Sequence, residues 1–214
     1  MKKTKKLISL LLSIVMLFTS LTCAVSAYAE EKVQPRISFS ATLKIISCPT
    51  NSSLNSSSGL LGHSFLVVTN VGNSTITVGH MSVPVGESIT LGTFSNRSKH
   101  NGIWYNIEGY CGLNKSYYGL TTALTGSDLT TLNKTINAND NWTLSKNCSY
   151  FAKTVWNSVS SVKVSGTNPA SLSESIQKKS NYEINPKIPS KSINTIAYQT
   201  STGIKYDTSG ASKS

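Results

Sequence analysis

The segment that begins at Ser145 carries a single helical stripe of apolar side chains, and this stripe constrains the fold more than any other feature of the sequence. Its apolar positions fall at i, i+3, i+4, i+7, i+8 and i+11, which is the spacing of one face of an α-helix. Ser145 and Asn147 precede the stripe and are suitable helix caps. The stripe must be buried against another layer of structure, and its members are Cys148, Phe151, Ala152, Val155, Trp156 and Val159.

Four runs of β-forming residues lie upstream of this helix and supply the second layer. Turn residues separate them at 71–74 and around Pro84 and Gly86. The first two runs indicate a hairpin, and all four together predict an antiparallel meander. The chain is therefore expected to be α+β, with a meander packed against the N-terminal end of the cysteine-bearing helix. The runs cover residues 63–70, 75–80, 88–94 and 102–108.

Other segments show weaker patterns. Residues 41–46 alternate and predict an edge strand within an N-terminal extension, 30–58. Helices are expected from Ser127, which is a good N-cap, and over 172–179. The main domain is assigned to residues 59–185. A polar tail follows at 186–214, with one weak hairpin around 195–206.

The N-terminus has the three parts of a cleavable secretory signal peptide. Four lysines lie in the first six residues, an apolar stretch runs to about Val25, and Ala27-Tyr28-Ala29 forms an A-x-A exit. An uncleaved membrane anchor is the alternative, but the abrupt polar turn after Ala29 favours cleavage. Residues 1–29 are therefore predicted to be removed, which leaves 185 of the 214 residues, about one domain. The mature protein is expected to be secreted, with no membrane span after cleavage.

Charge and composition narrow the classes of partner. Loss of the four leader lysines takes the net charge from +11 to +7. The remaining basic residues are scattered and do not interleave with aromatic residues, so no nucleic-acid partner is expected. The positive charge fits either attraction to an anionic cell envelope or simple solubility. No His-Glu-x-x-His or Cys-x-x-Cys motif is present, so neither a metal site nor a cofactor is expected.

Three cysteines remain after the leader is removed. An odd number in an oxidising compartment leaves either one thiol unbridged or an intermolecular disulfide. The economical pairing joins Cys48 to Cys111 and leaves Cys148 free. Cys148 lies in the first turn of its helix, where the helix dipole and unbonded N–H groups stabilise a thiolate. Cys148 is therefore the candidate nucleophile, with a buried core cysteine as the alternative.

A nucleophilic cysteine needs a base, and the candidates are three histidines. His63 opens the first predicted strand. His80 lies on the second, and either hairpin register puts it on the same face as His63. We expect Cys148 to attack a carbonyl, His63 to accept and return the proton, and His80 to orient His63. His100 lies in a polar turn and is expected to be solvated.

These residues resemble a known family. Gly62-His63-Ser64-Phe65 at a strand start, a meander, and then Asn147-Cys148 opening a helix are similar to the circularly permuted NlpC-type papain-like hydrolases, which share their order with lecithin-retinol-acyltransferase-like proteins. The resemblance spans about residues 62–159. It implies a papain-like fold and a thiol protease or amidase that acts through an acyl-enzyme, often on a cell-wall peptide. The longer gap from His63 to His80 leaves Asn70 and Asn106 as alternative third residues.

Two other functions compete with this interpretation. One is a non-catalytic module that binds the cell envelope or a partner through the aromatic strand around Trp104. The other is an acyltransferase or thioesterase. Paired-carboxylate glycosidase chemistry is disfavoured, because the acidic residues of the central domain show no pair spacing. The sequence favours a hydrolase acting on a peptide or peptidoglycan-like amide.

Overall fold

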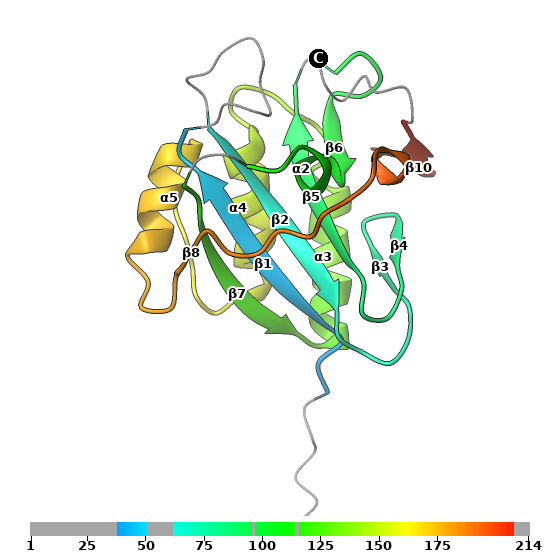
Figure 1. The fold of residues 1–214 in the computed structure, drawn as a ribbon, viewed down its shortest axis with the longest axis horizontal. Helices are drawn as coiled ribbons and strands as arrows, with labels where there is room; N and C mark the ends of the chain where they lie inside the picture. The colour runs from blue at the N-terminus through cyan, green and yellow to red at the C-terminus, as the bar shows by residue number, and fades with distance from the viewer. Residues whose placement is uncertain (1–37, 51–61, 96, 114–115, 208–214) are drawn as a thin grey trace, which may run out of the picture. The chain divides into compact units, whose positions relative to one another are not determined.

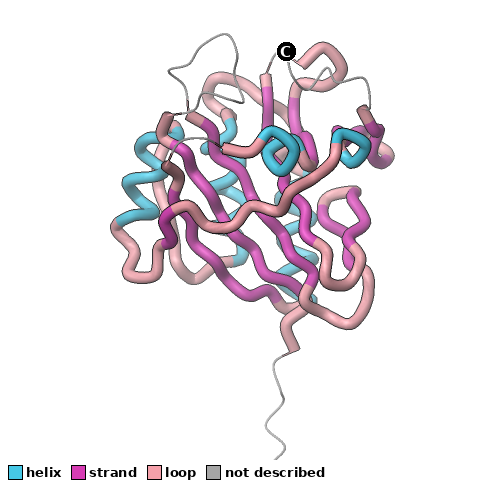
Figure 2. Tube along the Cα trace, viewed as in Figure 1, coloured by secondary structure: helices cyan, strands magenta, loops and turns pink. Residues whose placement is uncertain are grey.

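The computed structural model describes residues 38–50, 62–95, 97–113 and 116–207. The predicted signal peptide lies outside these residues. Helices and strands combine in one α+β unit, as expected (Figures 1 and 2). No helix among the described residues is long and apolar enough to cross a membrane.

Within the described residues the main sheet has eight strands in the order β10-β9-β6-β5-β2-β1-β7-β8, and every pairing among them is antiparallel. A separate hairpin is formed by β3 and β4. The strands are β1 (Ala41–Cys48), β2 (His63–Asn70), β3 (Ile76–Val78), β4 (Met81–Val83), β5 (Ser88–Phe94), β6 (Gly102–Tyr105), β7 (Tyr118–Leu124), β8 (Glu183–Ile184), β9 (Ala197–Thr200) and β10 (Gly203–Tyr206).

The longer helices cover one face of the sheet. The helices are α2 (Ile107–Cys111), α3 (Gly126–Asn137), α4 (Cys148–Val159), α5 (Pro169–Gln177) and the 3₁₀ turn η1 (Ile193–Thr195). In Figure 1, α3 and α4 lie behind the sheet, whereas α2 and the segment after β8 cross its front. Apart from Cys148, the α4 stripe packs with Leu66 and Val68 of β2 in the main core, which confirms the predicted amphipathic helix.

The alternation of β2 side chains divides its residues between these two faces. Leu66 and Val68 join the main core on the helix side. Phe65 and Val67 belong to a second cluster, which Ile188 of the crossing segment covers. Because side chains alternate along a strand, His63 lies on the same front face as Phe65. The first residue of β2 is therefore held at the end of the sheet, on the side where α2 packs.

Two predicted boundaries are wrong. The 41–46 segment is not an edge strand in an extension, because β1 lies between β2 and β7 in the middle of the sheet. Residues 186–207 are not a tail, since they cross the sheet and then form β9 and β10. The predicted hairpin near the C-terminus is confirmed by the β9–β10 pairing.

The predicted hairpin between residues 63–70 and 75–80 is also wrong. β2 pairs with β1 and β5, and residues 76–78 pair with 81–83 instead. The cause lies at Asn70, whose amide donates to the carbonyls of Ser74 (2.8 Å) and Val83 (2.9 Å) and holds the chain in a wide turn. Gly79 then adopts φ 60°, so Gly79 and His80 form the tight turn of the small hairpin.

Candidate active site

Cys148 is the first residue of α4, and the cap of that helix explains its position. The Asn147 side-chain oxygen accepts the N–H groups of Ser149 and Tyr150, both at 3.0 Å. The Asn147 amide donates to the Thr167 carbonyl at 2.8 Å, which fixes the cap against the loop before α5. The Asn147 side chain does not accept the backbone N–H of Cys148. The cysteine therefore starts the helix where the positive end of the helix dipole stabilises a thiolate.

His63 and Cys148 come together at this end of the sheet. The Cys148 thiol and the His63 imidazole share a hydrogen bond, although 85 residues separate them in the chain. Both side chains are buried, with 8% of Cys148 and 3% of His63 exposed. The two residues that the sequence singled out as nucleophile and base are thus in contact.

The third member of the site is Glu108, which no pattern in the sequence indicated. The His63 Nε2 atom lies 3.0 Å from Glu108 Oε1, and the Thr90 hydroxyl donates to Glu108 Oε2 at 2.7 Å. Glu108 is fully buried. Because Nε2 faces Glu108, the other ring nitrogen, Nδ1, is the one available to the thiol. The imidazole is therefore oriented by a carboxylate that is itself held by a hydroxyl group.

A local break in the chain explains the position of Glu108. The sequence predicts a strand through residue 108, but Asn106 adopts the left-handed conformation with φ 66° and β6 ends at Tyr105. Asn106 is held there, because its side-chain oxygen accepts the Thr90 N–H at 3.3 Å and its amide donates to the Thr195 carbonyl at 2.9 Å. The next residues form α2, which directs Glu108 toward His63.

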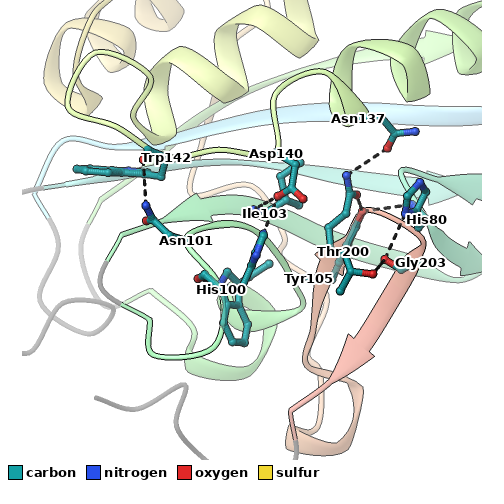
Figure 3. Close-up of polar contacts among 12 residues, drawn as sticks. His80, His100, Asn101, Ile103, Tyr105, Asn137, Asp140, Trp142, Thr200 and Gly203 are labelled. Atoms are coloured by element: carbon teal, nitrogen blue, oxygen red, sulfur yellow. Dashed lines mark hydrogen bonds and ion pairs between the residues drawn. The ribbon is translucent and has the colours of Figure 1, made fainter.

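The proposed alternatives for the third residue lie elsewhere. His80 is not the orienting residue. Its ring Nδ1 lies 3.2 Å from the Gly203 carbonyl, and its backbone N–H donates to the Tyr105 hydroxyl (Figure 3). The Asn70 amide holds the turn after β2, and Asn106 stabilises the β6–α2 break. The side chain that orients the His63 imidazole is Glu108 instead.

The electrostatics of the pair favour charge on both groups. Burial disfavours an imidazolium, but the hydrogen bonds to Cys148 and Glu108 outweigh it and raise the pKa of His63 to about 9. Burial likewise opposes a thiolate. The His63 hydrogen bond and charge, the Ser64 N–H and the Ser149 hydroxyl nevertheless lower the pKa of Cys148 below its ordinary value. Both shifts favour the thiolate–imidazolium pair over the neutral thiol and imidazole.

The other two cysteines differ from Cys148. None of the three described cysteines forms a disulfide, so the expected Cys48–Cys111 bridge is absent. The Cys48 thiol donates to the Thr50 carbonyl, and burial raises the pKa of this thiol. Cys111 packs with a separate cluster that includes Trp104 and Ile107. Cys48 is thus an internal reference for the reactivity of Cys148.

A second histidine–carboxylate pair ties the loop before Cys148 to the sheet. His100 Nε2 lies 2.7 Å from Asp140 Oδ1, which also accepts the Ile103 N–H at 2.8 Å. Next to it, the Asn101 amide donates to the Trp142 carbonyl at 3.2 Å (Figure 3). His100 also stacks on Tyr198, so it is not simply solvated. These contacts fix residues 140–142, a few positions before the nucleophile.

Packing leaves no room for a side chain at Gly92, beside the His63–Glu108 contact. A Cβ atom at Gly92 would contact Glu108 Oε1 and lie 2.9 Å from His63 Nε2. We expect Gly92→Ala to displace one of these groups and to lower the alkylation rate of Cys148 at pH 6 about fivefold, because the imidazolium is then less well stabilised. The measurement is iodoacetamide labelling followed by mass spectrometry.

Gly203→Ala is the matched control, because a Cβ there meets nothing within 4 Å. It should label like the wild type. Equal labelling of the Gly92→Ala and wild-type proteins would show that the His63–Glu108 geometry does not govern the thiol.

Comparison of the chain with protein-family models, with curated proteins and with solved structures finds no match. The function is therefore inferred from the geometry of Cys148, His63 and Glu108.

Proposed function

We propose that this protein is an exported cysteine hydrolase that cleaves an amide bond of a peptide, with a cell-wall peptide as the expected substrate class. The observation that carries the proposal is the buried Cys148–His63–Glu108 arrangement, in which thiol, imidazole and carboxylate are joined in series. The same arrangement supports the papain-like, circularly permuted interpretation, because the histidine strand precedes the cysteine helix. The leader sequence supports export.

The chemistry follows from the geometry of the pair. The Cys148 thiolate attacks the carbonyl carbon and forms a C–S bond. The N–H of Cys148, which the Asn147 cap leaves unused, is suitably placed to stabilise the oxyanion. His63 gives its proton to the leaving nitrogen as the C–N bond breaks. His63 then takes a proton from water, which attacks the thioester, and the C–S bond breaks to release the acid.

The test uses a mixture of cell-wall stem peptides and unrelated peptides, with products identified by mass spectrometry. We expect cleavage by the wild-type protein, none by Cys148→Ala, and retained cleavage by the control variant Cys48→Ala. Cleavage that survives in Cys148→Ala, or a thiol that forms no acyl-enzyme with any peptide, would contradict the proposal.

A second candidate is a non-catalytic binding module, and one cavity favours it. This cavity of about 640 Å³ lies on the front face of the sheet and is not lined by Cys148 or His63. Its lining carries Lys187 and the Lys44–Glu183 ion pair, together with several threonine and serine hydroxyls. If this were the main function, Cys148→Ala would keep its retention on cell walls, and the wild-type protein would cleave no bond.

A further inference from the structure

A chain of buried hydroxyl groups leads from the nucleophile into the protein. Ser149 Oγ lies 2.9 Å from Ser64 Oγ, and Ser64 Oγ lies 2.8 Å from Ser47 Oγ. Ser47 donates to the carbonyl of Pro169 at 2.8 Å. All three serines are fully buried. These hydrogen bonds join the first turn of α4 to β2, β1 and the start of α5.

The Pro169 carbonyl at the far end fixes the direction in which every hydroxyl of this hydrogen-bonded series donates. A carbonyl oxygen can only accept, so the single hydroxyl hydrogen of Ser47 is committed to Pro169. Ser47 Oγ can then only accept from Ser64, and Ser64 Oγ can only accept from Ser149. The hydroxyl hydrogens therefore point away from Cys148. In this arrangement the Ser149 hydroxyl donates nothing to the sulfur, which favours the protonated thiol over the thiolate.

The Ser149 hydroxyl also contacts the Cys148 sulfur, and it can serve a thiolate only by turning its hydrogen toward that atom. The Ser64 oxygen and the Cys148 sulfur thus compete for one hydrogen. The titratable group that faces the sulfur directly is His63, with Glu108 behind it. The N–H of Ser64 adds a fixed donor to the thiolate.

We propose that Ser64 is a positioning residue that sets the protonation state of Cys148 by competing with the sulfur for the Ser149 hydrogen. Removal of the Ser64 hydroxyl leaves Ser149 free to donate to the thiolate, whereas removal of the Ser149 hydroxyl deletes that donor. The two substitutions must therefore act in opposite directions. The inference rests on the proposed function for its meaning in catalysis, but its test needs no substrate, so the two can fail separately.

The experiment measures the rate of Cys148 alkylation by iodoacetamide against pH in the full protein. Ser64→Ala should move the midpoint of the profile to lower pH by about 0.7 of a pH unit, the effect of one net hydrogen bond. Ser149→Ala should move it to higher pH by a similar amount. Neither change strands a buried donor, because Ser47 keeps Pro169 and Ser64 keeps Ser47 as acceptor.

Two further variants separate this role from simple damage to packing. In the double variant Ser64→Ala/Ser149→Ala, the Ser64 change should add nothing, because there is no Ser149 hydrogen left to compete for. Ser173→Ala is the matched control. The Ser173 hydroxyl donates to the Ser47 backbone carbonyl at 3.1 Å and takes no part in the hydrogen-bonded series of serine hydroxyls. Shifts in the same direction, additive shifts in the double variant, or no shift in either single variant would overturn the proposal.

Discussion

Replacement of His63 with alanine is expected to lower the alkylation rate of Cys148 at pH 6 on the order of 100-fold. The thiol would lose the hydrogen bond and the positive charge that lower its pKa, while burial would continue to raise that pKa. At pH 6 an ordinary thiol is almost entirely protonated and reacts slowly. The measurement is the iodoacetamide labelling rate at Cys148, followed by mass spectrometry with Cys48 as the internal reference.

The control for this variant is His80→Ala, which removes the histidine that the sequence placed in the site. His80 contacts the Gly203 carbonyl instead, so this variant should label like the wild type. If His63→Ala labelled as fast as His80→Ala at pH 6, His63 would have no influence on the thiol.

His63→Ala also leaves Glu108 as a buried carboxylate without its imidazolium partner. Breaking a buried ion pair from one side costs about 3–5 kcal/mol in the free energy of unfolding. The double variant His63→Ala/Glu108→Ala removes the isolated charge, so it should unfold at a higher denaturant concentration than His63→Ala while its Cys148 remains slow to alkylate. Recovery of stability without recovery of reactivity separates the two roles of His63.

The second large effect is expected for Glu108→Gln, with about a tenfold lower alkylation rate at pH 6. The amide can still accept from Thr90, but it supplies no negative charge to the imidazolium. Because Glu108 helps to raise the pKa of His63, its loss lowers that pKa, and the thiolate loses its counter-charge at a lower pH. The labelling profile of Glu108→Gln against pH measures this change directly.

Glu87→Gln is the matched control for the charge change. Glu87 lies directly before β5 and pairs with Lys191 at 3.4 Å, and its side chain is 60% exposed. Its substitution should leave the Cys148 profile unchanged. A Glu108→Gln protein with a wild-type profile would assign Glu108 a purely structural role.

Local patterns predicted the parts of the site that depend on one element each. The helical stripe identified α4, and the position of Cys148 in its first turn followed from the cap residues. His63 was placed at the start of a strand, and β2 begins at that residue. These predictions succeed because apolar periodicity and cap chemistry act within a few residues along the chain.

The missed residues depend on contacts between distant segments. Glu108 faces His63 only because Asn106 adopts a left-handed conformation that Thr90 and Thr195 stabilise. The polar residues Thr42 and Lys44 made β1 look like an edge strand, whereas it pairs on both sides. A single acidic residue at the end of an apolar aromatic strand is the available signal for Glu108, and nothing in its sequence position indicates that it faces His63.

The most direct test of the account is the dependence of Cys148 alkylation on pH in the wild-type protein. The account predicts that the rate stays high as the pH falls well below the ordinary pKa of a thiol, because the lowered pKa preserves the thiolate there. The Cys48 rate should fall about tenfold per pH unit over the same range, since the pKa of that buried thiol is raised. A Cys148 profile that follows Cys48 would contradict the thiolate–imidazolium pair and the hydrolase proposed from it.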